Sequence, residues 1–251
     1  MPANRYFLRL AYNGTHYHGW QSQDNATTIQ EVLSHSLSLL VSEPVNLTGA
    51  GRTDTGVHAW QYYAHFDLAN PLDEAARKKL VFKLNGFLPN DIVIFEIIPV
   101  RPDAHARFSA ISRTYRYLIS TAKNPFLEGF AYYLYGNLDI DLMNKGAGIL
   151  LETKDFTSFS KVDTDSKTNI CKVSHAKWET EGDELIFTIK ANRFLRNMVR
   201  AIVGTLLELG RSRITLAEFK EIIESRNRSA AGGSVPACGL YLAEIEYPFG
   251  I

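Results

Sequence analysis

The run Gly49-Ala50-Gly51-Arg52-Thr53-Asp54-Thr55-Gly56-Val57-His58-Ala59 is the stretch from which the rest of the chain can be interpreted. Its glycines and threonines leave few side chains that could fill a core, and its only full charges are Arg52 and Asp54, so the pattern predicts a loop. A glycine-rich loop lets the backbone approach a ligand closely. An arginine two residues from an aspartate can hold that carboxylate ionised, because a nearby cation favours the charged form. The run therefore predicts a loop that presents one anionic carboxylate; the alternative is that Asp54-Thr55-Gly56 is only a turn between two strands.

The same run resembles the active-site signature of the TruA-type tRNA pseudouridine synthases, Gly-Arg-Thr-Asp-x-Gly-Val-His-Ala, which specifies eight residues in nine positions. Further blocks that resemble this family stand in family order across nearly the whole chain. They are Tyr12-Asn13-Gly14 through Gly19-Trp20-Gln21-Ser22-Gln23, Asn85 with Leu88-Pro89, His105-Ala106-Arg107-Phe108-Ser109-Ala110, Arg113-Thr114-Tyr115-Arg116-Tyr117, Asp155-Phe156-Thr157-Ser158-Phe159, Asn192 through Gly204, and Gly239-Leu240-Tyr241-Leu242. The departures are small: Asn13 stands where aspartate is commoner, and Ser234-Val235-Pro236-Ala237 precedes the last predicted strand.

The resemblance implies an isomerase that converts uridine to pseudouridine in the anticodon stem-loop of tRNA, at tRNA positions 38, 39 and 40. It implies that Asp54 is the catalytic carboxylate, that Arg52 and Arg200 are its cationic partners, and that Arg200 comes from the other domain. It also implies that Tyr115 stacks near the target uracil, since a flipped base needs a flat surface to replace its lost stacking. A homodimer that holds one tRNA is the expected assembly.

Composition narrows the class of protein. At 251 residues and 28.2 kDa the chain can form one large domain or two small ones. Its two cysteines, Cys171 and Cys238, can make neither a disulfide framework nor a thiolate zinc site, and none of its seven histidines joins a ligand-spaced pair, so no metal is expected. No nucleotide-phosphate motif is present, and no cofactor is expected. The N-terminus lacks an apolar signal segment and no apolar run approaches membrane-spanning length, which indicates a cytoplasmic protein without a membrane partner.

Charge is segregated along a chain whose formal net charge is zero. Residues 101–123 carry five bases and one acid, residues 124–185 six lysines and eleven acids, and residues 186–213 six bases and one acid. A neutral chain is unusual for an RNA-binding domain, but these basic segments supply the positive charge that phosphate needs. A solvated face is the ordinary alternative for such a run.

The first predicted domain covers residues 1–104. Its expected elements are a strand at 6–12, a helix that opens with the capping box Thr28-Ile29-Gln30-Glu31, a short strand at 45–48, a strand in which Trp60, Tyr62, Ala64 and Phe66 share one face, a helix through Ala76, Leu80 and Leu84, and a strand at 92–100. This order, β-α-β-β-α-β, is that of the split βαβ or ferredoxin-like unit.

The second predicted domain covers residues 105–251 and repeats that order without visible sequence repetition. Its expected elements are strands at 112–121, 171–179, 185–191 and 240–247 and helices at 142–151, 193–209 and 215–225. The predicted fold class is therefore α+β, with two ferredoxin-like units that form the pseudouridine synthase fold and a cleft between them for a large substrate.

Basic and aromatic side chains mark the second domain. In the strand at 112–121, the period of two places Arg113, Tyr115 and Tyr117 on one face, and Tyr117 is expected to pack in the core. In the helix expected from Arg193, the residues Arg193, Arg196 and Arg200 fall on one stripe. Arg193 and Arg196 are assigned to RNA phosphate, and Arg107 and Arg113 to substrate binding.

Isomerisation of uridine needs no redox change or energy donor, which fits a chain without cofactor motifs. Asp54 could attack the sugar C1′, abstract a proton, or add to the uracil ring, and the residues leave these routes open. Two other functions stay open as well: a non-catalytic tRNA-binding protein on the same fold, and a glycosidase-like enzyme that acts on a free nucleoside.

Overall fold

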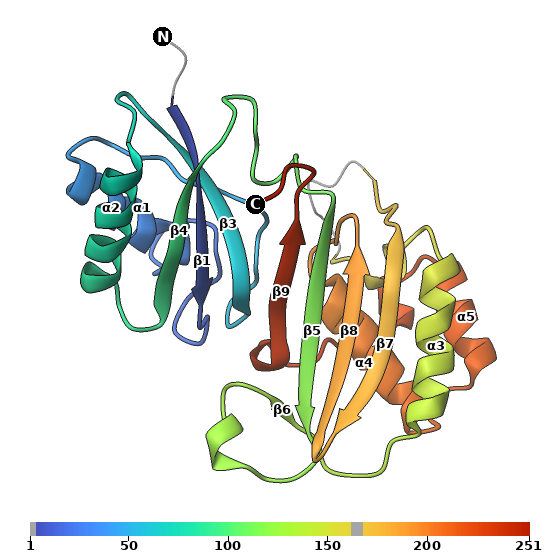
Figure 1. Ribbon diagram of the computed structural model, residues 1–251. Helices are drawn as coiled ribbons and strands as arrows, with labels where there is room; N and C mark the ends of the chain where they lie inside the picture. Colours follow the sequence, from blue (N-terminus) through green and yellow to red (C-terminus); the bar gives the residue numbers. More distant parts are fainter. Residues whose placement is uncertain (1–3, 162–167) are drawn as a thin grey trace. The chain divides into compact units, whose positions relative to one another are not determined.

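The structure is a computed structural model that describes residues 4–161 and 168–251. It divides into two compact units, one of the described residues up to Ile111 together with Leu242–Ile251, the other Ser112–Tyr241. Each has strands on which helices pack, so the chain is a mixed α+β protein (Figure 1).

The first unit is organised around antiparallel strands in the order β4-β1-β3, with β2 paired to β3. Its elements are β1 Asn4–Tyr12, α1 Ile29–Val41, β2 Thr48–Gly49, β3 His58–Leu68, α2 Glu74–Phe87 and β4 Ile92–Pro99. Thr28 caps α1 by accepting from the Glu31 amide, and Asp73 caps α2 in the same way. Figure 1 shows α1 and α2 side by side next to these strands.

The middle of β3 is buried on both faces, from Tyr62 to Phe66. Tyr62, Ala64 and Phe66 are buried as the alternation predicted, but Trp60, on the same face, keeps 42% of its surface exposed. The short strand expected at 45–48 is wrong in its position, because β2 comprises only Thr48–Gly49. Before it the backbone uses side chains as partners: Val45 donates its amide to the Ser38 hydroxyl, and the Leu47 carbonyl accepts from Gln30.

The second unit has the antiparallel order β5-β8-β7. Its regular elements are β5 Ser112–Ser120, β6 Tyr132–Tyr133, α3 Ile140–Glu152, β7 Val173–Glu181, β8 Glu184–Ala191, α4 Met198–Gly210 and α5 Leu216–Glu224, and β9 Leu240–Glu246 runs from this unit into the first. α3 contacts both β7 and α4, and eleven of the thirteen residues of α4 are buried. The helix expected at 215–225 opens with a full capping box, in which the Thr215 hydroxyl accepts the Glu218 amide and the Glu218 carboxylate accepts the Thr215 amide.

The units differ in extent from the predicted ranges 1–104 and 105–251. Hydrogen bonds tie the segment after residue 104 to the first unit: Ala106 donates its amide to His65, and Ile111 donates its amide to the Glu246 carbonyl. Tyr247 near the C-terminus donates its hydroxyl to the Ala106 carbonyl. The last ten residues therefore belong to the unit formed by the start of the chain. A single boundary in the sequence cannot describe a unit that is made of two separate segments.

One predicted element is wrong in a way that matters for function. The helix expected from Arg193 begins at Met198, after Asn197 in the left-handed conformation (φ 66°). A residue in that conformation ends a right-handed helix, so residues 193–196 are not helical. Asn192 does not cap a helix there, because its side-chain oxygen accepts the Lys172 amide. Arg193, Arg196 and Arg200 therefore do not form a helical stripe.

Candidate active site

The signature run lies in the first unit, where residues 50–57 connect β2 to β3. Thr53 is buried, Asp54 is half-buried and Arg52 is exposed. The Thr53 hydroxyl shares a hydrogen bond of 2.8 Å with the Tyr12 hydroxyl at the end of β1. The residue before the carboxylate is thus anchored in the core while Asp54 reaches solvent.

Asp54 itself opens a tight turn. Its carbonyl accepts the Val57 amide at 3.2 Å, and Gly56, the third residue of the turn, has a φ of 76°. A type II turn requires a positive φ at that position, which glycine adopts without steric cost. The alternative drawn from the sequence, that Asp54-Thr55-Gly56 is a turn between two strands, is therefore correct as local structure. It does not compete with a chemical role, because Asp54 is only half-buried on this turn.

A second loop, residues 13–20, packs against the signature run. Trp20 donates its amide to the Thr53 carbonyl at 3.3 Å, and Gly56 donates its amide to the Tyr17 carbonyl at 3.3 Å. A side chain at Gly19 would overlap the Thr53 carbonyl oxygen, and Gly19 has a φ of 85°. Only glycine satisfies both the conformation and the contact.

Asn13, which stands where aspartate is commoner, keeps the local geometry of this second loop. The side-chain oxygen of Asn13 accepts both the amide and the hydroxyl of Thr15, at 3.0 and 2.7 Å. A carboxylate oxygen would accept the same two donors, so asparagine replaces aspartate here without loss of a bond.

Three aromatic rings pack together next to the signature run. Trp20 and Tyr62 stack with centroids 4.2 Å apart, and Tyr12 meets Tyr62 edge to face at 5.6 Å. The Tyr62 hydroxyl donates to the Gly51 carbonyl and lies 3.3 Å from the Gly51 amide. The rigid rings fix the backbone on one side of Arg52, and the sequence reasoning had not assigned Tyr62 this role.

Arg107 lies on a turn that two histidines hold. His105 accepts the Arg107 amide through Nδ1 at 3.1 Å, and His65 accepts the Ala106 amide through Nδ1 at 3.2 Å. The two imidazoles meet edge to face at 4.6 Å. Burial and the Arg5 cation lower the pKa of His65 to about 4, and the same two causes lower the pKa of His105. Both rings are therefore neutral near pH 7, which leaves a ring nitrogen able to accept these amides.

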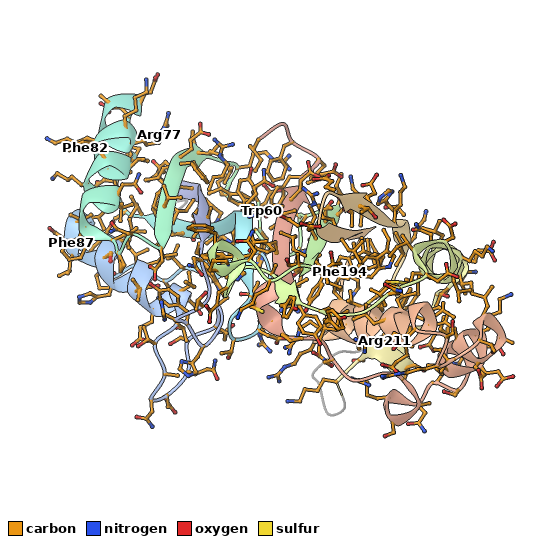
Figure 2. The ribbon with its side chains drawn as sticks, turned by 90° about the horizontal axis from the view of Figure 1, so that it is seen from below. Trp60, Arg77, Phe82, Phe87, Phe194 and Arg211 are labelled. Atoms are coloured by element: carbon orange, nitrogen blue, oxygen red, sulfur yellow. The ribbon has the colours of Figure 1, made fainter. Side chains whose placement is uncertain are left out.

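In the second unit, Tyr115 is half-buried on β5, and its ring meets Phe194 edge to face, with centroids 5.0 Å apart at 83°. Phe194, labelled in Figure 2, comes from the segment before α4, and sequence reasoning had not singled it out. Its position beside the basic residues was the available signal. Tyr117 is buried as predicted, and its hydroxyl donates to the Pro236 carbonyl at 2.8 Å. Burial raises the pKa of Tyr117, so this hydroxyl stays protonated.

The remaining predicted cations also lie in the second unit. Arg113 donates to the Asn192 carbonyl at 3.1 Å, which brings it to the start of the segment that carries Arg193 and Arg196. Arg196 is exposed and Arg193 is half-buried. Arg200 donates through Nε to the Val235 carbonyl at 2.7 Å, so its side chain is held along the segment that precedes β9.

Within the units, the structure brings some of the predicted residues together. Arg52 and Arg107 line one pocket of the first unit, and Arg113 and Tyr115 lie on one strand of the second, where Tyr115 meets Phe194. Among residues 4–161 and 168–251, no group of three or more His, Cys, Asp and Glu side chains could hold a metal ion. No helix in the described part of the chain is long and apolar enough to cross a membrane.

Comparison with known proteins shows the family to which the chain is similar. A sequence model of the family described as tRNA pseudouridine synthase matches residues 10–109 and 149–248. Relatives named tRNA pseudouridine synthase A include one from Bacteroides fragilis, 52% identical over 251 residues and covering 99% of this chain and 98% of the relative. One from Parabacteroides distasonis is 51% identical and covers 97% and 96%. One from Acetivibrio thermocellus is 40% identical and covers 96% and 98%.

The α+β units and the match along both therefore define the class as that of the pseudouridine synthases, which are isomerases. Within that class, the chain belongs to the tRNA pseudouridine synthase family.

Proposed function

We propose that this protein isomerises uridine to pseudouridine in the anticodon stem-loop of tRNA, at positions 38, 39 and 40, with Asp54 as the catalytic carboxylate. The observation that carries the proposal is the signature loop. Thr53 is fixed in the core by Tyr12, while Asp54 beside it is half-buried on a tight turn. A preorganised carboxylate that reaches a bound base without moving its backbone is what a nucleophile or general base requires.

The other assigned residues fit around this carboxylate. Arg52 and Arg200 are the cations that keep Asp54 anionic in this proposal, and Tyr115 is the surface on which the flipped uracil stacks. Tyr115 is suited to this because Phe194 meets its ring edge to face and because the residues around it on β5 are only partly buried. Arg107, Arg113, Arg193 and Arg196 bind the RNA backbone, which is how folded RNA is recognised without base reading.

The proposal includes the assembly and the fold on which it rests. We propose a homodimer that acts on tRNA in the cytoplasm, and two ferredoxin-like units. The strand order β4-β1-β3-β2 and the element order β-α-β-β-α-β support the ferredoxin-like assignment for the first unit. A molar mass measured by light scattering, with and without tRNA, tests the dimer: a monomer under both conditions would exclude it.

The decisive experiment uses unmodified tRNA transcribed with tritium at C5 of its uridines and the purified protein without added metal or nucleotide. Each isomerisation releases the C5 tritium, because C5 becomes the glycosidic carbon. Asp54→Asn should bind tRNA and release less than about a thousandth of the wild-type rate, since an amide can neither attack nor abstract a proton. Asp24→Asn is the matched control, because Asp24 is an exposed aspartate of the same unit, outside the signature run.

Three results would each reject part or all of the proposal. Tritium release by Asp54→Asn at rates near wild type would remove Asp54 from the chemistry. No release from any tRNA by the wild-type protein, with tRNA binding intact, would instead indicate a non-catalytic RNA-binding protein. Conversion of free uridine at a rate that matches tRNA would overturn the substrate assignment.

A further inference from the structure

A pocket of about 150 Å³ opens in the first unit beside the signature run. Its walls come from the loop before α1, from α1, from β2 and the signature run, and from the turn that carries Arg107. The lining residues are Trp20, Gln21, Gln30, Leu47, Thr48, Gly49, Gly51, Arg52 and Arg107. Asp54 is absent from this lining, so the pocket is a neighbour of the proposed catalytic carboxylate rather than its binding site for uracil.

The charge of the pocket favours an anion. Two arginines, Arg52 and Arg107, are among its lining residues, which include no Asp or Glu. Guanidinium groups bind phosphate through parallel N–H donors, and paired arginines are the usual protein partners of phosphodiester groups. A cavity of about this volume holds one six-membered ring, so a single phosphodiester group fits and a folded domain does not.

Contacts within the protein hold the walls of the pocket together. Gln30 spans one side, donating its amide to the Leu47 carbonyl at 2.8 Å and accepting the Ser22 amide at 2.9 Å. Gly49 lies so close to the rings of Trp20 and Tyr62 that a side chain there would overlap both. These contacts fix the backbone of β2, which leads into Gly51 and Arg52.

Hydrogen bonds also fix the backbone at Arg107. The Arg107 amide donates to His105, the neighbouring Ala106 amide donates to His65, and the guanidinium lies 5.5 Å from the Phe108 ring centroid. The turn is thereby fixed to β3, and Arg107 lines the same pocket as Arg52. Two cations from segments more than fifty residues apart converge on one small volume.

We propose that this pocket binds a backbone phosphate of the tRNA within about two nucleotides of the uridine that is isomerised. This inference rests on the proposed function, because it takes tRNA as the substrate. Arg52 and Asp54 are two residues apart, so their Cα atoms lie at most about 7 Å from each other. A phosphate at Arg52 therefore belongs to a nucleotide close to the base at Asp54. Its capture would hold the flipped strand in register with the carboxylate.

A cycle of protein and RNA changes tests this pairing. A series of ligated tRNAs is made, each with a single neutral methylphosphonate. The substituted phosphate is moved one position at a time, from two nucleotides before to two nucleotides after the target uridine. Dissociation constants are measured in an Asp54→Asn background, so that turnover does not change the RNA. At one phosphate, neutralisation and Arg107→Gln should each weaken binding about tenfold, and the combination should weaken it no further than either alone.

Two matched changes separate the pocket from general charge. Lys83→Gln removes an exposed cation of α2 in the same unit, and its effect should add to that of every methylphosphonate. Arg107→Lys keeps the charge without the planar fork and should recover part of the lost affinity. A thermal unfolding midpoint within a few degrees of wild type establishes that Arg107→Gln is folded.

The result that overturns the inference is additivity of Arg107→Gln with neutralisation at every phosphate tested, or no phosphate whose neutralisation weakens binding. Tritium release from unsubstituted tRNA by the wild-type protein is measured in parallel and separates the pocket inference from the proposed function. Normal release with additive effects rejects the pocket alone. No release from any tRNA rejects the proposed function, and the pocket inference with it.

Discussion

The backbone of Gly19 lies directly against the carbonyl oxygen of Thr53, the residue before the proposed catalytic aspartate. No other amino acid fits, because any Cβ would overlap that oxygen and because Gly19 has a φ of 85°. The same carbonyl also accepts the Trp20 amide. The loop at 13–20 thus sets the position of Thr53, and through it the direction in which Asp54 projects.

This contact predicts that Gly19→Ala displaces Asp54 and lowers the rate of tritium release at saturating tRNA at least about a hundredfold, since small misplacements of reacting groups are costly. Gly182→Ala is the matched control. Gly182 also has a positive φ, 60°, but a side chain there meets open space. It should cost about 1–2 kcal/mol of folding free energy for the conformation and leave the rate unchanged. Equal rates in the two folded variants would show that the Gly19 contact does not position the carboxylate.

The segment before α4 yields a prediction that differs from the one a helical stripe would give. Arg196 is exposed and Arg193 is half-buried, so the two residues should contribute unequally to phosphate binding. Arg196→Gln should weaken tRNA binding and reduce the slope of log K against log salt by about 1, and Arg193→Gln should reduce it less. Fluorescence titrations from 50 to 200 mM salt measure both slopes.

Arg213→Gln provides the comparison for these titrations. Arg213 belongs to the same basic stretch of sequence, but its guanidinium already lies 3.2 Å from Glu208. An arginine with a carboxylate partner releases fewer counterions on meeting phosphate, so its loss should change the slope less than the loss of Arg196. A larger effect for Arg213 than for Arg196 would mean that RNA runs along the other end of α4.

Local sequence patterns predicted two helix starts correctly and failed at the segment before α4. Thr28 and Thr215 were correctly predicted to start helices because the cap and its glutamate are local signals within four residues. The false start at Arg193 had the right apolar spacing, but Asn197 turns left-handed and donates its side chain to Ser234, which lies in a distant segment. Local patterns could not report that partner, and tertiary contacts overrode them.

The candidate site was likewise predictable only in part. The signature run and Arg107 are recognisable from residue order, and the position of Asp54 on a turn follows from Gly56. The pocket that Arg52 shares with Arg107 was not predictable, because it depends on Gln30 bridging to Leu47 and on Trp20 stacking with Tyr62. These contacts link segments whose separation in sequence carries no periodic signal.

The pair of Tyr115 and Phe194 predicts a positioning effect in the second unit. An edge-to-face contact of this kind contributes about 0.5–1.5 kcal/mol beyond its buried area. Phe194→Leu keeps an apolar side chain but loses the ring edge, so tritium release should fall about two- to tenfold while tRNA affinity changes little. Phe126→Leu, at a residue of the same unit that is 88% exposed, should have no effect. A loss that appears only in tRNA affinity would place Phe194 on the RNA surface instead of behind Tyr115.

The histidines behind Arg107 predict an acid-sensitive fold. His65 has a pKa of about 4 in the folded protein, against about 6.5 in an unfolded chain, so the unfolded state binds more protons between these values. Stability from this group is therefore complete above about pH 6.5 and is lost as the pH falls toward 4. Protonation also removes the lone pair that accepts the Ala106 amide, because both nitrogens of an imidazolium are donors.

Urea unfolding at pH 7 and at pH 4.5 measures this contribution. Wild type should lose about 1–2 kcal/mol more between the two pH values than His65→Asn, whose amide oxygen accepts a hydrogen bond but does not titrate. Arg5, His105 and Asp67 face His65 and are unchanged in both proteins, so their titration contributes to both. His175→Asn, at an exposed position of β7, should lose as much as wild type. If His65→Asn loses as much stability as wild type, protonation of His65 is not what destabilises the fold between these pH values.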